Sequence, residues 1–278
     1  MNPSLRLGKI AGIKVGLHWS VALIALVLTF TLSQSLLPTT APGFTDLAYL
    51  IVAGATTALF LGSIVAHELG HSLVARRNGV GIIGITLFAL GGVAEMSKES
   101  DRPGPAFRIA AAGPAVSVGV GALSLAVAWA ASTVGLADVS VAALVWLGII
   151  NLGLAVFNML PAVPLDGGRV LQAALWYRSG DQLRATVKAA SVGRVLGTLL
   201  LIAGVVQFFM TGSGLWTAAI GWFVTSGAKG EELRARGEIL KRDLDIRSAA
   251  ARHPSAPLQP GATSVIDGSV IEAEVVDH

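Results

Sequence analysis

The chain has 278 residues, of which 53% are apolar and only 13% are Asp, Glu, Lys or Arg, about half the charged share of a typical soluble domain. Together with a mean hydropathy of +0.70, this composition indicates a membrane protein. The chain contains no cysteine, which excludes disulfides, thiolate metal sites and a cysteine nucleophile, and its net charge is +3.

Six apolar segments are candidates for crossing a bilayer, which requires about 20 mostly apolar residues. They cover residues 17–37, 47–75, 106–133, 140–160, 192–210 and 214–228, and the last of them is short. The sequence therefore predicts an all-α polytopic membrane protein with about six transmembrane helices.

The distribution of positive charge predicts the orientation of these spans. All 20 Lys and Arg residues lie before the first span, between spans two and three, between spans four and five, after span six, or at the start of spans three and five. The loops after spans one, three and five have none. The positive-inside rule then places both termini in the cytoplasm and makes span two run inward. Because topology explains the basic residues, we expect no nucleic-acid partner.

Two segments between the spans have their own patterns. Residues 80–96, VGIIGITLFALGGVAEM, are rich in Ile, Val, Thr and Phe and are interrupted by Gly91 and Gly92. This pattern predicts two short strands around a glycine turn, forming a membrane-associated β-hairpin. Residues 167–190 predict an amphipathic helix at the membrane interface.

The second span contains three ionisable side chains in the stretch AHELGH, residues 66–71. Positions i and i+4 lie on one face of a helix, so His67 and His71 can bind one zinc ion. Glu68 is placed to act as general base on a water bound to that metal. An ordinary helix with two satisfied histidines is the alternative. Ionisable groups inside a span are costly and functional by default, which favours the metal site.

A catalytic zinc requires a third protein ligand, and the remaining histidines lie at the start of span one or in the C-terminal tail. A carboxylate is therefore expected. Asp166 follows span four in FNMLPAVPLDGGR, where Pro161 and Pro164 break the helix, and it reaches the same depth as AHELGH. The alternative is a turn aspartate that caps the helix starting at Gly167.

The two motifs together resemble the site-2 protease family of intramembrane zinc metalloproteases. The resemblance covers roughly residues 10–228 and includes GIKVGLHWS, LFALGGVAEM and AAGPAVS. It implies a three-helix catalytic core in spans two to four. It also implies one zinc ion per chain, held by His67, His71 and Asp166, with Glu68 as the base.

Three further features follow from this resemblance. Asn158 in FNMLP matches a family asparagine that faces the active site, where it could bind the substrate backbone or the oxyanion. Its alternative role is a hydrogen bond between helices. The hairpin over residues 82–96 would hold substrate as an added strand, unless it is only structural. Ser117 stands where family members often have asparagine.

The expected function is that of an endopeptidase with a membrane-anchored protein substrate. It would cut within or near the transmembrane helix of that protein, near the cytoplasmic side, and release a cytoplasmic regulator. The competing hypothesis is a catalytically silent membrane scaffold or metal-binding protein, which would have no need of Glu68. We expect an integral protein of a bacterial or archaeal cell membrane.

The chain is expected to divide into three parts. A protease domain covers residues 1–228, a charged cytoplasmic helix covers 229–252, and a disordered tail covers 253–278, where prolines and polar residues leave little that could pack.

Overall fold

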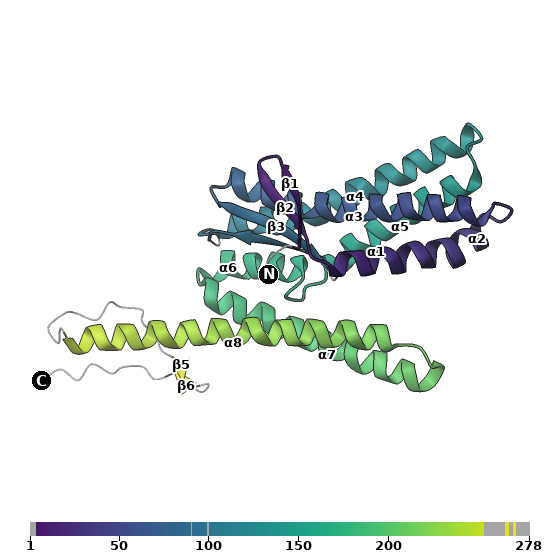
Figure 1. Cartoon of the computed structure of the whole chain (residues 1–278). Coiled ribbons are helices and arrows are strands. Elements are labelled where there is room, and N and C mark those ends of the chain that lie inside the picture. The colour runs from purple at the N-terminus through teal and green to yellow at the C-terminus, as the bar shows by residue number, and fades with distance from the viewer. Residues whose placement is uncertain (1–3, 90, 99, 253–264, 267–268, 271–278) are drawn as a thin grey trace, which may run out of the picture.

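The computed structural model of the chain describes residues 4–89, 91–98, 100–252, 265–266 and 269–270 (Figure 1). In this part of the chain, five helical segments are long and apolar enough to cross a membrane. They are Ser20–Thr40, α3 (Asp46–Arg77), α4 (Pro103–Thr133), α5 (Asp138–Asn158) and α7 (Gln182–Thr211). The first of them consists of α1 (Ser20–Thr31), a π-helical turn (Leu32–Leu36) and α2 (Leu37–Thr40).

The predicted sixth span and the charged helix form one continuous helix. Helix α8 covers Leu215–Arg252. It therefore contains residues 215–228 of the predicted sixth span and the whole of the predicted charged helix, residues 229–252. Within the described part of the chain, α8 is not among the segments that meet the length and hydropathy requirements for a span. The structure therefore supports a mostly helical membrane protein with five candidate spans, and a sixth crossing stays a prediction.

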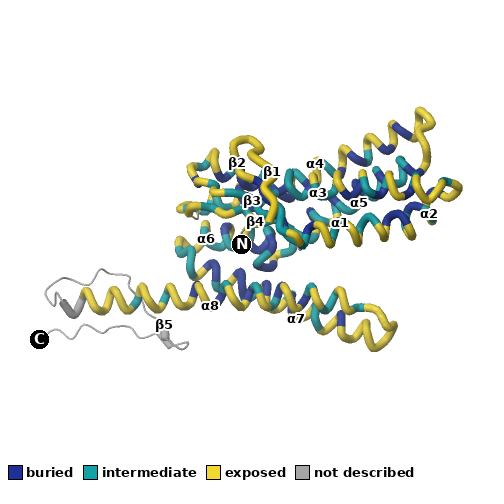
Figure 2. Tube along the Cα trace, in the orientation of Figure 1, coloured by how far each residue is buried: buried dark blue, intermediate teal, exposed yellow. Residues whose placement is uncertain are grey.

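Helices α3, α4 and α5 pack against one another, and α1 lies along α3 (Figure 1). Helices α7 and α8 form a separate antiparallel pair that joins this bundle through α6 (Asp166–Ser179). Many residues of these helices are exposed (Figure 2), and they include large apolar ones such as Leu26, Leu59 and Trp129, as contact with lipid requires.

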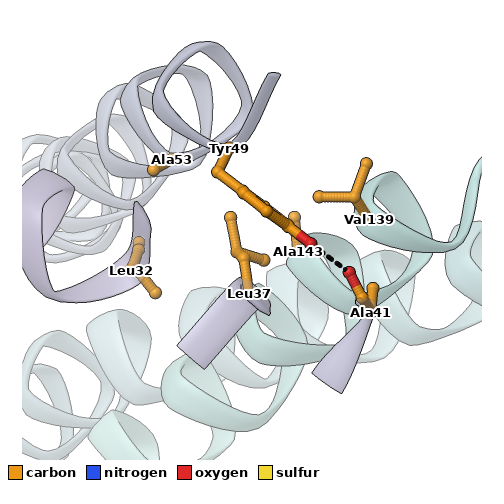
Figure 3. Close-up of a cluster of buried hydrophobic side chains, with 7 residues drawn as sticks. All are labelled: Leu32, Leu37, Ala41, Tyr49, Ala53, Val139 and Ala143. Carbon is orange, nitrogen blue, oxygen red and sulfur yellow. Dashed lines mark hydrogen bonds between the residues drawn. The ribbon is translucent and has the colours of Figure 1, made fainter. Parts of the chain in front are cut away.

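A cluster of buried side chains closes the bundle at the end away from the sheet (Figure 3). The Tyr49 hydroxyl on α3 donates a hydrogen bond of 2.7 Å to the carbonyl oxygen of Ala41, just after α2. Val139 and Ala143 of α5 belong to the same cluster. This contact ties the first candidate span to α3 and α5 without using any charged residue.

The opposite end carries a four-stranded sheet rather than the predicted hairpin alone. The hairpin itself is confirmed as β3 (Ile82–Phe88) and β4 (Gly91–Met96), which pair antiparallel. The basic segment ahead of the first span adds β1 (Leu5–Ile10) and β2 (Ile13–Leu17), and β2 pairs in parallel with β3. The order is β1-β2-β3-β4, so β4 is an edge strand.

The sheet packs on the part of α3 that contains AHELGH. Ile13 and Val15 of β2 and Ile85 and Leu87 of β3 are buried, and apolar side chains of α3 between Leu61 and Leu73 cover them. Alternate residues of a strand share one face, which explains why this set alternates along both strands. The sheet is thereby fixed beside the two histidines.

The predicted amphipathic helix over residues 167–190 is shorter than expected. Helix α6 ends at Ser179 because Gly180 adopts a left-handed conformation with φ of 72°. Asp181 then caps α7, since its side chain accepts a hydrogen bond of 3.0 Å from the main-chain N–H of Arg184. The fifth candidate span accordingly begins at Gln182, not at residue 192.

The C-terminal tail is described only at Val265–Ile266 and Ser269–Val270, which pair as two short strands. The rest of the segment for which disorder is predicted, residues 253–264, 267–268 and 271–278, lies outside the described residues.

Candidate metal centre and active site

The two histidines of AHELGH face the interior of the bundle from one side of α3. His67 and His71 are one turn apart, and both are buried. Their Nε2 atoms lie 3.2 Å from each other. The helical spacing predicted from the sequence therefore brings the two imidazoles to one point, as a shared metal requires.

Helix α4 holds the other nitrogen of each ring. The Nδ1 atom of His71 donates a hydrogen bond of 2.7 Å to the main-chain carbonyl oxygen of Ile109. The Nδ1 atom of His67 lies 2.9 Å from the Ser117 hydroxyl oxygen, and Ser117 is fully buried. With the proton on Nδ1 of both rings, both Nε2 atoms keep a free lone pair for a metal.

Asp166 is the first residue of α6, and its side chain reaches the same point. Its Oδ2 atom lies 3.2 Å from Nε2 of His67 and 3.3 Å from Nε2 of His71. Leu165 occupies the N-cap position of α6, and no side-chain cap hydrogen bond is formed there. Asp166 is thus the first residue within the helix, not its N-cap, and its Oδ2 atom lies against the two histidines.

The electrostatic setting of Asp166 keeps its carboxylate ionised. Burial by itself would raise the pKa of Asp166, but the imidazole groups of His67 and His71 next to its carboxylate lower the pKa to about 2. An ionised carboxylate is the form that binds a metal ion.

The loop before Asp166 packs closely against two glycines, one on α7 and one on α8. A Cβ atom added to Gly193 of α7 would lie 2.9 Å from the main-chain nitrogen of Val163. A Cβ atom added to Gly227 of α8 would lie 2.8 Å from Cδ of Pro164. Because these distances are too short for any larger residue, the α7–α8 pair rests directly on the loop before Asp166.

The geometry of the three side chains fits a tetrahedral metal ion. For zinc bonds of about 2.0–2.1 Å, tetrahedral ligand atoms lie about 3.3–3.4 Å apart. The three ligand atoms of His67, His71 and Asp166 are separated by 3.2, 3.2 and 3.3 Å. Two neutral imidazoles and a carboxylate are also a common ligand set of catalytic zinc.

Gly113 of α4 keeps space open next to these atoms. A Cβ atom at position 113 would lie 2.6 Å from Nε2 of His67 and would clash with Nε2 of His71. Any larger residue would fill the place that a bound ion needs. The sequence pointed to this segment only through the motif AAGPAVS, and the functions of Gly113 and Ile109 were not predicted.

The other two predicted site residues, Glu68 and Asn158, differ in their relation to the histidines and Asp166. Glu68 is half-buried beside His67, and its charge interacts with His67, His71 and Asp166. Asn158 is the half-buried last residue of α5. Among the described residues no hydrogen bond joins Asn158 to the histidines, Glu68 or Asp166. Its predicted function in catalysis stays a prediction.

Comparison with known proteins agrees with this site. The chain matches the family model of Peptidase family M50 over residues 55–143 and 135–203. It is 39% identical over 274 residues to Rip3 of Mycobacterium tuberculosis, which is named as a zinc metalloprotease, covering 96% of this chain and 68% of Rip3. It is 32% identical over 257 residues to zinc metalloprotease MJ0392 of Methanocaldococcus jannaschii, covering 91% and 68% of the two chains.

A solved structure shows the same fold. The structure of the site-2 protease from Methanocaldococcus jannaschii matches with a TM-score of 0.54 at 32% sequence identity, covering 82% of this chain and 94% of that chain. The first matched family segment includes His67, Glu68 and His71, and the second includes Asp166. The chain therefore belongs to peptidase family M50 and is an integral membrane zinc metalloprotease of the site-2 protease type.

Proposed function

We propose that this protein is an intramembrane endopeptidase that hydrolyses a peptide bond of a membrane-anchored protein, within or near its transmembrane helix. The observation that carries the proposal is the convergence of His67, His71 and Asp166 on one point beside Glu68. Two imidazoles and a carboxylate with an adjacent glutamate suit metal-assisted hydrolysis of an amide.

Each of these side chains has a distinct proposed role. His67, His71 and Asp166 would hold the zinc ion, which when bound polarises the scissile carbonyl and lowers the pKa of a water molecule toward 7. Glu68 would take a proton from the attacking water and pass it to the leaving amine. Asn158, through its carboxamide, would donate a hydrogen bond to the substrate backbone or to the oxyanion.

Strand β4 is the proposed binding surface for the substrate backbone. A transmembrane helix must unwind before cleavage, and its freed N–H and C=O groups then need partners. Within the described sheet β4 pairs only with β3, so its outer edge can accept an added strand. Because β4 also contacts α3, a substrate paired there would run past AHELGH.

The topology supports cleavage near the cytoplasmic side. The basic residues gather at the end of the bundle where the sheet and the site lie, and the positive-inside rule assigns that end to the cytoplasm. Both termini would then be cytoplasmic, and the product would be a cytoplasmic fragment, such as a regulator. Residues 1–228 would form the protease domain, and residues 229–252 the cytoplasmic part of α8.

The experiment that tests this function compares the wild-type protein with Glu68→Gln in detergent, using a model transmembrane substrate and measuring bound zinc. We expect about one zinc per chain in both proteins and cleavage only by the wild type, since glutamine cannot accept the proton. Glu238→Gln, the same chemical change at an exposed position of α8, controls for folding. Cleavage by Glu68→Gln at the wild-type rate would contradict the role of Glu68.

The alternative of a silent scaffold or metal-binding protein makes a different forecast for the same experiment. It expects zinc in both proteins and no cleavage by either one across a panel of transmembrane substrates. The retention of Glu68 beside the histidines favours the protease, because metal binding alone does not require that carboxylate.

A further inference from the structure

The second residue of β4, Gly92, lies directly beside the proposed catalytic base. Gly92 pairs with Leu87 of β3, at the end of the hairpin next to the turn. Ala94, two residues further on, packs into the cluster between the sheet and α3. Since residues i and i+2 of a strand share a face, Gly92 also faces α3.

The side chain of Glu68 occupies the space where a side chain at position 92 would begin. A Cβ atom built on Gly92 would lie 2.8 Å from Cδ and 3.0 Å from Oε1 of Glu68, and it would clash with Cγ. The Glu68 side chain therefore lies flat against the main chain of β4. Any residue larger than glycine would have to displace either this strand or the glutamate.

Other restraints on the Glu68 carboxylate are weak. In the part of the chain that the structure describes, no hydrogen bond or ion pair holds its oxygens. The two neighbouring histidines, in contrast, each have a partner on α4 at 2.7–2.9 Å. Packing against β4 is thus a contact that limits where the carboxylate can point.

We propose that Gly92 is a positioning residue, whose bare main chain holds the Glu68 carboxylate in the orientation needed for proton transfer. This inference rests on the proposed protease function. It adds that the strand offered to the substrate and the surface that orients the base are the same strand. A general base must lie within hydrogen-bond reach of the proton that it takes, and misplacement by about 1 Å can lower a rate about 100-fold.

The direct test is Gly92→Ala in the full-length protein, assayed for cleavage and for bound zinc. We expect kcat to fall about tenfold or more, KM to change less than about twofold, and zinc to stay near the wild-type stoichiometry. The matched control is Gly104→Ala, because a Cβ atom at Gly104 meets nothing within 4 Å. Wild-type kcat in Gly92→Ala, or loss of its zinc, would overturn the positioning role.

A second measurement tests the contact independently of activity. Gly92→Ala should lower the unfolding temperature measurably in the presence of Glu68, because the new methyl group meets Cγ and Cδ of that side chain and must displace it. In a Glu68→Ala background the same change should have little effect, since the space is then free. Equal shifts in both backgrounds would overturn the contact.

The two measurements separate this inference from the protease function itself. A wild-type protein that cleaves no transmembrane substrate would contradict the proposed function. The comparison of unfolding temperatures with and without Glu68 would still decide whether Gly92 and Glu68 are coupled. Cleavage by the wild type together with uncoupled unfolding would overturn only the positioning role.

Discussion

The Nδ1 atom of His71 donates its hydrogen bond to the main-chain carbonyl oxygen of Ile109, whereas Nδ1 of His67 is paired with the side chain of Ser117. The orientation of His71 is therefore independent of the residue type at position 109. The orientation of His67 depends on one hydroxyl group that a single substitution can remove. The two ligands of the proposed zinc site should differ accordingly in their sensitivity to mutations in α4.

Ser117→Ala should weaken zinc binding without removing a ligand. Losing the partner of a metal-binding histidine typically lowers metal affinity about 10- to 100-fold. The measurement is zinc occupancy against a competing chelator. Ser124→Ala is the matched control, because the Ser124 hydroxyl donates its hydrogen bond within its own helix, to the carbonyl oxygen of Val120 at 2.9 Å. Equal affinities for the two variants would contradict the role of Ser117.

Gly113→Ala should abolish zinc binding and cleavage together. The added methyl group would occupy the space between the two Nε2 atoms, so the histidines could no longer converge on an ion. Elemental analysis of the purified protein gives the zinc content. Gly119→Ala on the same helix should keep full occupancy, since a Cβ atom there meets nothing within 4 Å. A Gly113→Ala protein with one zinc per chain would show that the site lies elsewhere.

Asp166→Asn should lower zinc occupancy while leaving the fold intact. The amide has nearly the same shape as the carboxylate but lacks its negative charge, and a carboxamide is a weak ligand for zinc. Zinc content should fall well below one per chain, and cleavage should fall with it. Asp101→Asn, at an exposed position, serves as the control. Unchanged zinc content in Asp166→Asn would exclude Asp166 from the ligand set.

Asp181→Ala should destabilise the start of α7. Loss of an N-cap costs about 0.5–2 kcal/mol, which can be followed as a lower unfolding temperature in detergent. Asp181→Asn should keep the capping bond to the Arg184 N–H and lose only the ion pairs with Arg184 and Arg242, so its effect should be smaller. A larger effect for asparagine than for alanine would contradict the capping role.

The effect of Asp181 should depend on pH in a defined direction. Partial burial would raise the pKa of Asp181, but the Arg184 N–H and the guanidinium groups of Arg242 and Arg184 lower it below its usual value. The ionised form is thus favoured by folding, and its stabilisation is present above the usual pKa of about 3.9. It is lost as the pH falls through the lowered pKa, so the difference between wild type and Asp181→Ala should shrink in acid.

Local features of the sequence were enough to predict most helices and the candidate metal ligands that the structure brings together. Hydropathy placed four of the candidate spans to within a few residues, because the requirement for about 20 apolar residues is set by the bilayer and not by neighbouring segments. The spacing of His67 and His71 follows from helix geometry alone. The β-branched run around Gly91 likewise predicted the β3–β4 hairpin.

Several elements could not be predicted because they depend on pairing between distant segments. Strands β1 and β2 lie in a short basic stretch. Strand β2 joins the β3–β4 hairpin by pairing with β3, in a register that places Val15 opposite Ile85, a residue far along the chain. The end of α6 was missed because Gly180 and Asp181 act together as a stop and a cap. Neither signal alters the hydropathy on which the prediction relied.

Composition and spacing thus specify a membrane protein with a two-histidine motif and make Asp166 a candidate third ligand, which the resemblance to site-2 proteases favours. The close approach of α4 and β4 to that site is a property of the folded chain. Ile109 and Ser117 orient the rings, Gly113 leaves room for the ion, and Gly92 lies against Glu68. The groups involved are a main-chain carbonyl, a hydroxyl and two glycines. Their roles depend on which residues packing places next to them, and the sequence alone does not show those neighbours.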